Sequence, residues 1–171
     1  MDTIKTKAYA KINLALDVLG KYENGYHQVN MVMQSISICD DIDISITKDG
    51  KIEAYTNRSY IPSDMKNLAC KAAAEYISAA GIQGYGVSMH INKRIPVCAG
   101  MGGGSSDAAA VIRALDRFFD TCMSDEQLAK IGNNVGSDVV FCLFGGTMLA
   151  KGRGEILQRL SDFPGNNPRV S

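Results

Sequence analysis

The segment from Gly100 to Ser106 has the composition of a loop that holds the phosphates of a nucleotide such as ATP. Glycine occupies positions 100, 102, 103 and 104, and Ser105 and Ser106 follow. Glycine lets the backbone turn sharply and brings its N–H groups close to an anion. A helix predicted to begin near Ser106 adds unpaired N–H groups and the positive end of its dipole. Either serine hydroxyl could cap this helix, donate to a phosphate or bind Mg²⁺.

The common phosphate-binding patterns narrow what this loop could be. No lysine follows the glycines, as a Walker A loop requires, and Ser105 stands where a dinucleotide-binding loop needs its third glycine. The chain also lacks the H-R-D and D-F-G tripeptides of a protein kinase. The alternative is a flexible turn with a serine cap. Four clustered glycines each cost conformational entropy, however, and a turn alone would not require them all.

Polar residues far from this loop in the sequence could supply the rest of a phosphate-transfer site. Residues 11–18 alternate in polarity, which predicts a strand whose apolar residues, Ile12 to Val18, line a buried face. Lys11 and Asn13 then lie side by side on the opposite face. Asp138 could accept the proton of a substrate hydroxyl. The alternatives are a solvated strand lysine and an aspartate that only caps a turn.

The strands and helices that must position these residues alternate loosely along the chain. We expect a strand over residues 31–46, and Asp49-Gly50 predicts a hairpin turn into residues 52–55. Another strand is expected over residues 87–91. A mixed sheet in an α+β fold fits this order better than a doubly wound parallel sheet.

The predicted helices have recognisable ends. Ser63 or Asp64 is expected to cap the first helix, and Gly81 to end it. Ser124, followed three residues later by Gln127, has the spacing of a capping box. The simplest organisation is one domain over residues 1–160, with a tail or linker over 161–171.

Composition limits the classes of partner. The chain has 171 residues and a formal net charge of zero, which argues against nucleic acid and for a small molecule. Its five cysteines are widely spaced and it has two histidines, so neither a disulfide framework nor a zinc site is expected. There is no run of about 18 apolar residues that could span a membrane. We therefore expect a cytoplasmic protein. The aspartates at 40, 41 and 43 are expected on a solvated strand face rather than in a metal cluster.

The loop pattern P-x-x-x-G-x-G-x-G-S-S-D-A-A, from Pro96 to Ala109, resembles the phosphate loop of the galactokinase, homoserine kinase and mevalonate kinase superfamily, the GHMP kinases. Three further segments are similar to its 4-diphosphocytidyl-2-C-methyl-D-erythritol kinase branch: residues 10–14, 25–27 and 136–139. All four occur in family order across almost the whole chain.

The resemblance implies a fold and a set of roles. The fold is the GHMP N-terminal domain, with its ribosomal protein S5 domain 2-like topology, and the C-terminal ferredoxin-like domain is absent. Asp138 is the base and Lys11 stabilises the developing charge, while Tyr26, His27 and Asn13 contact the cytidine-diphosphate-linked substrate. Mg²⁺ is bound through Ser106. ATP is bound by Asn67, Lys93, Pro96, Val97, Cys98, Ala99, Gly100, Met101, Gly102, Gly103, Gly104, Ser105 and Ser106.

Two features depart from the family pattern and leave alternatives open. Val140 stands where the family usually has proline, and the second half of the family fold is missing. The resemblance implies an ATP-dependent kinase that phosphorylates the 2-hydroxyl of 4-diphosphocytidyl-2-C-methyl-D-erythritol in isoprenoid biosynthesis. One alternative is a nucleotide-binding fragment without catalysis, or half of a split enzyme. Another GHMP kinase acting on a small alcohol is a third reading. RNA binding through the S5-like fold is disfavoured by the zero net charge.

Overall fold

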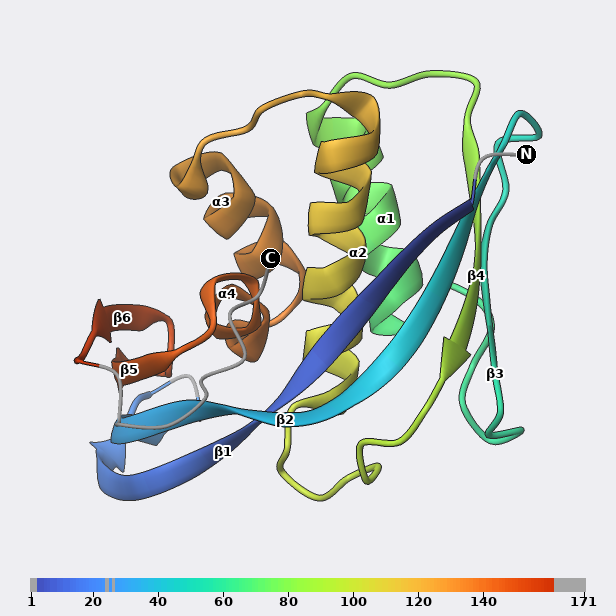
Figure 1. The fold of residues 1–171 in the computed structure, drawn as a ribbon. Coiled ribbons are helices and arrows are strands. Elements are labelled where there is room, and N and C mark those ends of the chain that lie inside the picture. Colours follow the sequence, from blue (N-terminus) through green and yellow to red (C-terminus); the bar gives the residue numbers. More distant parts are fainter. Residues whose placement is uncertain (1–2, 24, 26, 162–171) are drawn as a thin grey trace.

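One mixed sheet, with helices packed against it, forms the framework of the protein (Figure 1). The structure is a computed structural model and describes residues 3–23, 25 and 27–161. The expected tail therefore lies outside the described residues except for Ser161. In chain order the elements are β1 (Thr3–Lys21), β2 (His27–Thr47), β3 (Ile52–Thr56), α1 (Leu68–Ala79), β4 (Gly86–Asn92), α2 (Gly103–Phe119), α3 (Asp125–Val135), α4 (Ser137–Phe144), β5 (Thr147–Gly152) and β6 (Ile156–Arg159).

The order of strands across the sheet is β3-β4-β2-β5-β6, and β1 pairs with β2 along most of its length. The α+β class is confirmed, but the predicted hairpin at Asp49-Gly50 is wrong. Gly50 does make a turn, with a φ of +71°. The strand that follows does not return along β2. It pairs in parallel with β4, which itself lies beside β2, and α1 provides the crossover between β3 and β4.

The core lies between the sheet and helices α1 and α2, which run side by side in Figure 1. The expected alternation in β4 is confirmed, because Val87, Met89 and Ile91 are buried. Across the interface, α2 contributes an unbroken buried run from Ser106 to Ile112. Alanines make up much of this run, which lets the helix approach the strands closely.

The helix ends differ in part from those predicted. The N-cap of α1 is Asn67, not Ser63 or Asp64, and its side chain accepts a hydrogen bond from the N–H of Ala69. The capping box at Ser124 and Gln127 is confirmed at the start of α3. None of the described helices is long and apolar enough to cross a membrane.

The first strand differs most from expectation. Leu14, Leu16 and Val18 were predicted to be buried, yet they are 47%, 51% and 59% exposed. Ala8 and Ala10, earlier in the same strand, are the residues that pack into the core. Alternation correctly predicted the strand, but which face becomes buried depends on where the helices lie. The helix α2 meets β1 at Tyr9, through Ser106, and the loop before α2 meets it at Lys11, through Met101.

Candidate active site

The glycine loop runs from the end of β4 into the first turn of α2. The helix begins at Gly103, so the predicted start near Ser106 is wrong by almost one turn. Gly102 has a φ of +68°, in the left-handed region that favours glycine, and a Cβ there would lie 3.1 Å from Cγ of Lys11. A Cβ on Gly103 would lie 3.2 Å from Cγ2 of Ile95. Backbone conformation and close packing therefore both require glycine in this loop.

The first turn of α2 directs backbone N–H groups toward the loop. The N–H of Ser106 donates to the carbonyl of Gly102 at 2.8 Å, and Gly102 provides no side-chain cap. The N–H groups of residues 103–105 precede this bond and have no partner within the helix. Together with the positive end of the helix dipole, they can bind an anion such as a phosphate.

A cavity of about 440 Å³ lies between the loop, the end of β4 and the segment before α1. Every residue from Pro96 to Gly104 lines it, as do Asn67 and Lys93. The structure thus brings together all the residues expected to bind the nucleotide except Ser105 and Ser106. The volume is within the range of small-molecule binding sites.

The two serines occupy different environments. Ser106, expected to bind Mg²⁺, is 2% exposed, and its hydroxyl donates to the carbonyl of Tyr9 in β1 at 2.7 Å. Its oxygen also lies 3.4 Å from Sγ of Cys142. The side chain therefore ties α2 to β1 and does not line the cavity, and the expected Mg²⁺ role of Ser106 stays a prediction. Ser105 is only partly buried at the start of α2.

Lys11 and Asp138 meet although they are far apart in the sequence. The Nζ of Lys11 lies 3.3 Å from Oδ2 of Asp138 and donates to Oδ1 of Asn13 at 3.1 Å. The side chain of Lys11 is 6% exposed and that of Asp138 is 30% exposed. Asp138 is in the first turn of α4, where the helix dipole favours a negative charge. This arrangement leaves a carboxylate accessible at the surface, with a buried ammonium beside it.

The pairing of β1 with β2 is irregular beside Lys11. The pairing with β2 shifts register between Tyr9 and Lys11, and Ala10 and Lys11 are buried in succession. Tyr9 faces Cys39 and Lys11 faces Ser35, so the extra residues of this bulge lie in β2, where they locally change the direction of the paired strands. The N–H of Lys11 donates to the carbonyl of Met101 at 3.0 Å, and its stem passes over Gly102. The lysine is thereby fixed directly beside the glycine loop.

Beneath the loop, Lys93 is held between two aspartates. Its Nζ lies 2.5 Å from Oδ2 of Asp40 and 2.5 Å from Oδ2 of Asp107. Asp40 is fully buried, so its expected place on a solvated face is wrong. Its Oδ1 accepts from the N–H groups of Arg94 and Ile95, at 2.5 and 2.8 Å. Among the described residues no group of His, Cys, Asp or Glu could hold a metal ion by itself.

Burial governs the protonation of this cluster. Loss of solvation raises the pKa of Asp107 to about 8, although the charge of Lys93 acts in the opposite direction. Burial alone would lower the pKa of Lys93, but the charges and hydrogen bonds of both aspartates raise it. One ammonium faces two carboxylates in a dry site, so the excess negative charge favours uptake of a proton.

Sequence reasoning missed the roles of Asp40 and Asp107. Asp107 directly follows the two serines of the loop motif, which was an available signal. Asp40 carried no such signal. It reaches Lys93 because β2 pairs with β4 in the register that aligns Asp41 with Asn92. That register cannot be read from the alternation of either strand.

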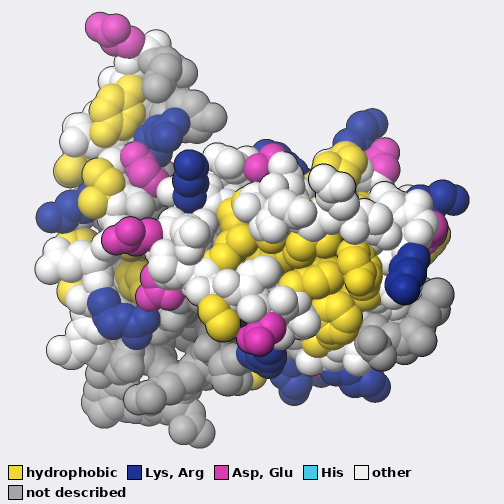
Figure 2. All heavy atoms as spheres, turned by 90° about the horizontal axis from the view of Figure 1, so that it is seen from above, with side chains coloured by type: hydrophobic (Ala, Val, Ile, Leu, Met, Phe, Trp, Pro, Cys, Tyr) yellow, Lys and Arg dark blue, Asp and Glu magenta, His cyan; other side chains and the backbone are white. Residues whose placement is uncertain are grey.

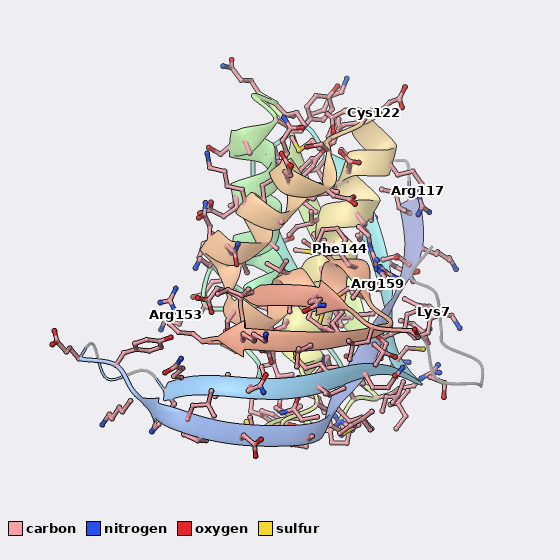
Figure 3. The ribbon with its side chains drawn as sticks, turned by 90° about the vertical axis from the view of Figure 1, so that its left-hand side faces the viewer. Lys7, Arg117, Cys122, Phe144, Arg153 and Arg159 are labelled. Atoms are coloured by element: carbon pink, nitrogen blue, oxygen red, sulfur yellow. The ribbon has the colours of Figure 1, made fainter. Side chains whose placement is uncertain are left out.

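The expected substrate contacts lie at two distant places. Asn13 is beside Lys11, whereas His27 is exposed at the far end of the β1–β2 hairpin, opposite Lys21. Tyr26 lies outside the described residues. In Figure 3, Arg153 in the turn between β5 and β6 points toward the same end of the molecule as this hairpin. The pairing of Val29 with Gly152 agrees with that placement.

Comparison with known proteins identifies the family. The chain is 46% identical, over 95% of its length, to the 4-diphosphocytidyl-2-C-methyl-D-erythritol kinase of Clostridium acetobutylicum, of which it covers 57%. It is also 46% identical to the enzyme of the same name from Brevibacillus brevis, with 92% of this chain and 53% of the relative covered. The family model described as the GHMP kinases N-terminal domain matches residues 67–146. The chain holds a GHMP kinase N-terminal domain.

Solved structures support the GHMP fold. A crystal structure of 4-(cytidine 5'-diphospho)-2C-methyl-D-erythritol kinase is 36% identical with a TM-score of 0.77, and covers 92% of this chain and 55% of its own. The mevalonate kinase of Methanococcus jannaschii is 17% identical, has a TM-score of 0.71, and covers 94% of this chain and 56% of its own. The latter shows likeness of fold alone. This GHMP chain spans about half the length of the curated relatives it matches.

Proposed function

We propose that this chain is the nucleotide-binding part of a kinase that transfers phosphate from ATP to the 2-hydroxyl of 4-diphosphocytidyl-2-C-methyl-D-erythritol, in isoprenoid biosynthesis in the cytoplasm. The proposal rests on the ion pair of Lys11 with Asp138, whose Nζ and Oδ2 atoms lie 3.3 Å apart. The stem of the same lysine lies against Gly102 of the glycine loop. A candidate base and a candidate phosphate-binding loop are therefore joined through one residue. The names of the relatives suggest the substrate.

The loop and cavity would bind ATP. The N–H groups at the start of α2 would hold its phosphates, and Asn67 lies in the cavity wall where it could contact the nucleoside. Mg²⁺ binds kinase sites largely through the phosphates of the nucleotide, with few protein ligands. Ser105, rather than the buried Ser106, is the loop hydroxyl available to contribute one. The metal would neutralise part of the charge on the transferred group.

The residues beside the loop would act on the acceptor. Asp138 would accept the proton of the attacking hydroxyl, and Lys11 would offset the negative charge that develops as phosphate is transferred. Asn13 would keep the ammonium in place through the hydrogen bond of 3.1 Å. Tyr26 and His27 would contact the cytosine end of the substrate, which requires an extended ligand because His27 lies at the far end of the hairpin.

Exchange of Asp138 for asparagine tests this assignment. In a full-length form of the protein, Asp138→Asn should lower phosphate transfer by roughly 10²-fold or more, since general base catalysis typically contributes that much. ATP affinity should stay within about threefold of that of the unmodified protein, because Asp138 does not line the cavity assigned to ATP.

Asp43→Asn is the matched control, because Asp43 is an exposed aspartate on β2 and should leave transfer unchanged. Undiminished transfer by Asp138→Asn would refute the role of the base. Transfer to another small alcohol, but not to the cytidine compound, would assign a different GHMP kinase.

On the face shown in Figure 2, acidic and basic side chains are interspersed around an apolar area rather than gathered into a basic stripe. This distribution agrees with a small-molecule partner, which the proposal assumes.

A further inference from the structure

The exposed part of the glycine loop is anchored at its two ends. Residues 96–100 are all exposed, whereas Lys93 and Ile95 before them are 5% and 2% exposed. At the far end, the carbonyl of Met101 accepts from the N–H of Lys11. The conformation of the exposed segment therefore depends on how firmly these flanking residues are held.

Asp40 and Asp107 approach the two ends of the loop from different elements. Asp40, from β2, binds the ammonium of Lys93 and the N–H groups of Arg94 and Ile95, which lead into the loop. Asp107, from the second turn of α2, binds the same ammonium on the side where the loop ends. A single Nζ atom thus links the entry of the loop, its exit and the neighbouring strand.

The charge balance of the cluster shows that its main task is not to attract phosphate. One ammonium faces two carboxylates, so the positive charge of Lys93 is already neutralised within the protein. Burying charges costs solvation, so a buried ion cluster contributes little to net stability. In this protein it links β2, Lys93 and α2 through one ammonium. The Nζ atom also lies 3.3 Å from the position that a Cβ on Gly103 would take, directly below the start of α2.

We propose that Asp40 and Asp107 are positioning residues that hold Lys93 and both ends of the glycine loop in the nucleotide-binding conformation. This inference rests on the proposed function, because it assigns the loop to a nucleotide. Asp40 does not line the cavity, and Asp107 lines it but is only 4% exposed, so the proposed role does not depend on contact with the nucleotide. Their effect is to order the loop before the ligand binds, so that binding does not incur the entropy cost of ordering it.

The first arm of the test compares two substitutions of Asp107. Asp107→Leu removes the acceptor and leaves Lys93 with one partner, so the 171-residue chain should lose about tenfold or more in ATP affinity, the equivalent of an unmade charged hydrogen bond. Asp107→Asn keeps an oxygen acceptor of the same shape. This variant should bind ATP with an affinity within about threefold of that of the unmodified chain.

A neighbouring ion pair supplies the control. Arg94 and Asp41 lie 2.5 Å apart beside the cluster, but their side chains are 57% and 36% exposed. Asp41→Asn makes the same chemical change one residue from Asp40, at a surface pair that contributes little. It should change neither ATP affinity nor the mobility of the loop.

Hydrogen exchange separates positioning from general loss of stability. In the ligand-free chain, Asp107→Leu should speed amide exchange about tenfold over residues 97–103 and leave residues 108–115 of α2 unchanged, because only local opening becomes easier. If Asp107→Leu does not fold, the same two measurements, ATP affinity and amide exchange, are made on Asp40→Asn. Its amide would place an N–H group against the ammonium of Lys93 and break that contact.

The inference is overturned if ATP affinity is unchanged in the folded variant, or if exchange in the loop stays as it was. It is also overturned if exchange rises equally in the loop and in α2. Failure of the unmodified chain to bind ATP would refute the proposed function instead. In that case, comparison of amide exchange over residues 97–103 between the unmodified chain and Asp107→Leu would still show whether the cluster orders the loop.

Discussion

The two halves of β1 have similar alternating sequences but differ in how deeply their side chains are buried. In the first half, Ala10 and Lys11 are buried, the pairing with β2 is irregular, and the strand is hydrogen-bonded to α2 and the glycine loop. From Leu14 to Leu19 its apolar side chains are exposed. The difference lies in what covers the strand, not in the strand itself. Because α2 and the glycine loop are hydrogen-bonded to the first half, that half can hold Lys11 in a fixed direction.

The comparison predicts that changes near the loop alter ligand binding, whereas equivalent changes elsewhere alter stability alone. Gly102→Ala places a methyl group 3.1 Å from the stem of Lys11 at a φ of +68°. We expect ATP affinity to fall about tenfold or more, since both the loop and the lysine must move. Calorimetric titration of the chain with ATP measures this.

Gly50→Ala is the control for that variant. Its φ of +71° is similar, but a Cβ there meets no atom within 4 Å. Both variants should lose roughly 1–2 kcal/mol of stability from the left-handed conformation. If Gly50→Ala weakened ATP binding equally, the contact with Lys11 would not be the cause.

Ser106→Ala tests the tie between α2 and β1. The carbonyl of Tyr9 would lose its hydroxyl partner in a buried site, which should lower the free energy of unfolding by about 1–3 kcal/mol. Urea denaturation measures the change. Ser105→Ala should leave stability almost unaltered and weaken Mg²⁺-dependent ATP binding. The reverse pattern would favour Ser106 as the metal ligand.

Asp107 should give the protein a distinctive pH dependence. Its pKa is raised by burial to about 8, whereas an unfolded aspartate titrates near 4. Between these values the folded state holds a proton that the unfolded state releases. The stabilisation is therefore present at low pH and is lost as the pH rises through the folded pKa.

Denaturation measured from pH 5 to 8 should accordingly show the free energy of unfolding falling with pH. The fall should be smaller in Asp107→Asn, which has no proton to release. An identical slope in the two proteins would show that Asp107 does not hold the proton.

The smallest effect is expected in the exposed half of β1. Leu16→Ser should change the free energy of unfolding by less than about 0.5 kcal/mol, as surface substitutions usually do. Met33→Ala, in the buried part of the paired strand β2, should cost roughly 2–5 kcal/mol. Similar losses for both would mean that the distal hairpin is covered in solution.

Local features could be predicted from the sequence, and features that depend on packing could not. The capping box at Ser124 and the alternation in β4 are confirmed, because their causes lie within a few residues. The prediction of a hairpin at Gly50 was wrong, because a turn does not determine which strand the following segment pairs with. Here that segment, β3, pairs with β4 instead of β2. Asp40 was misplaced on the surface because its partner Lys93 is brought to it by strand register.

The candidate site shows the same limit. The glycine loop and the Lys11–Asp138 pair were predicted, and the structure places them together. Ser106 was given a metal because a hydroxyl after a phosphate loop often has that role. Its side chain points inward since the second serine of the motif falls on the buried face of α2.

The central claim, that the glycine loop holds a nucleotide, is tested most directly by amide exchange of the 171-residue chain with and without Mg²⁺-ATP. We predict slower exchange over residues 97–106, where the loop meets α2, and no change over residues 14–20 of the hairpin. Saturating ATP that leaves residues 97–106 unprotected, or that protects the hairpin instead, would contradict this account.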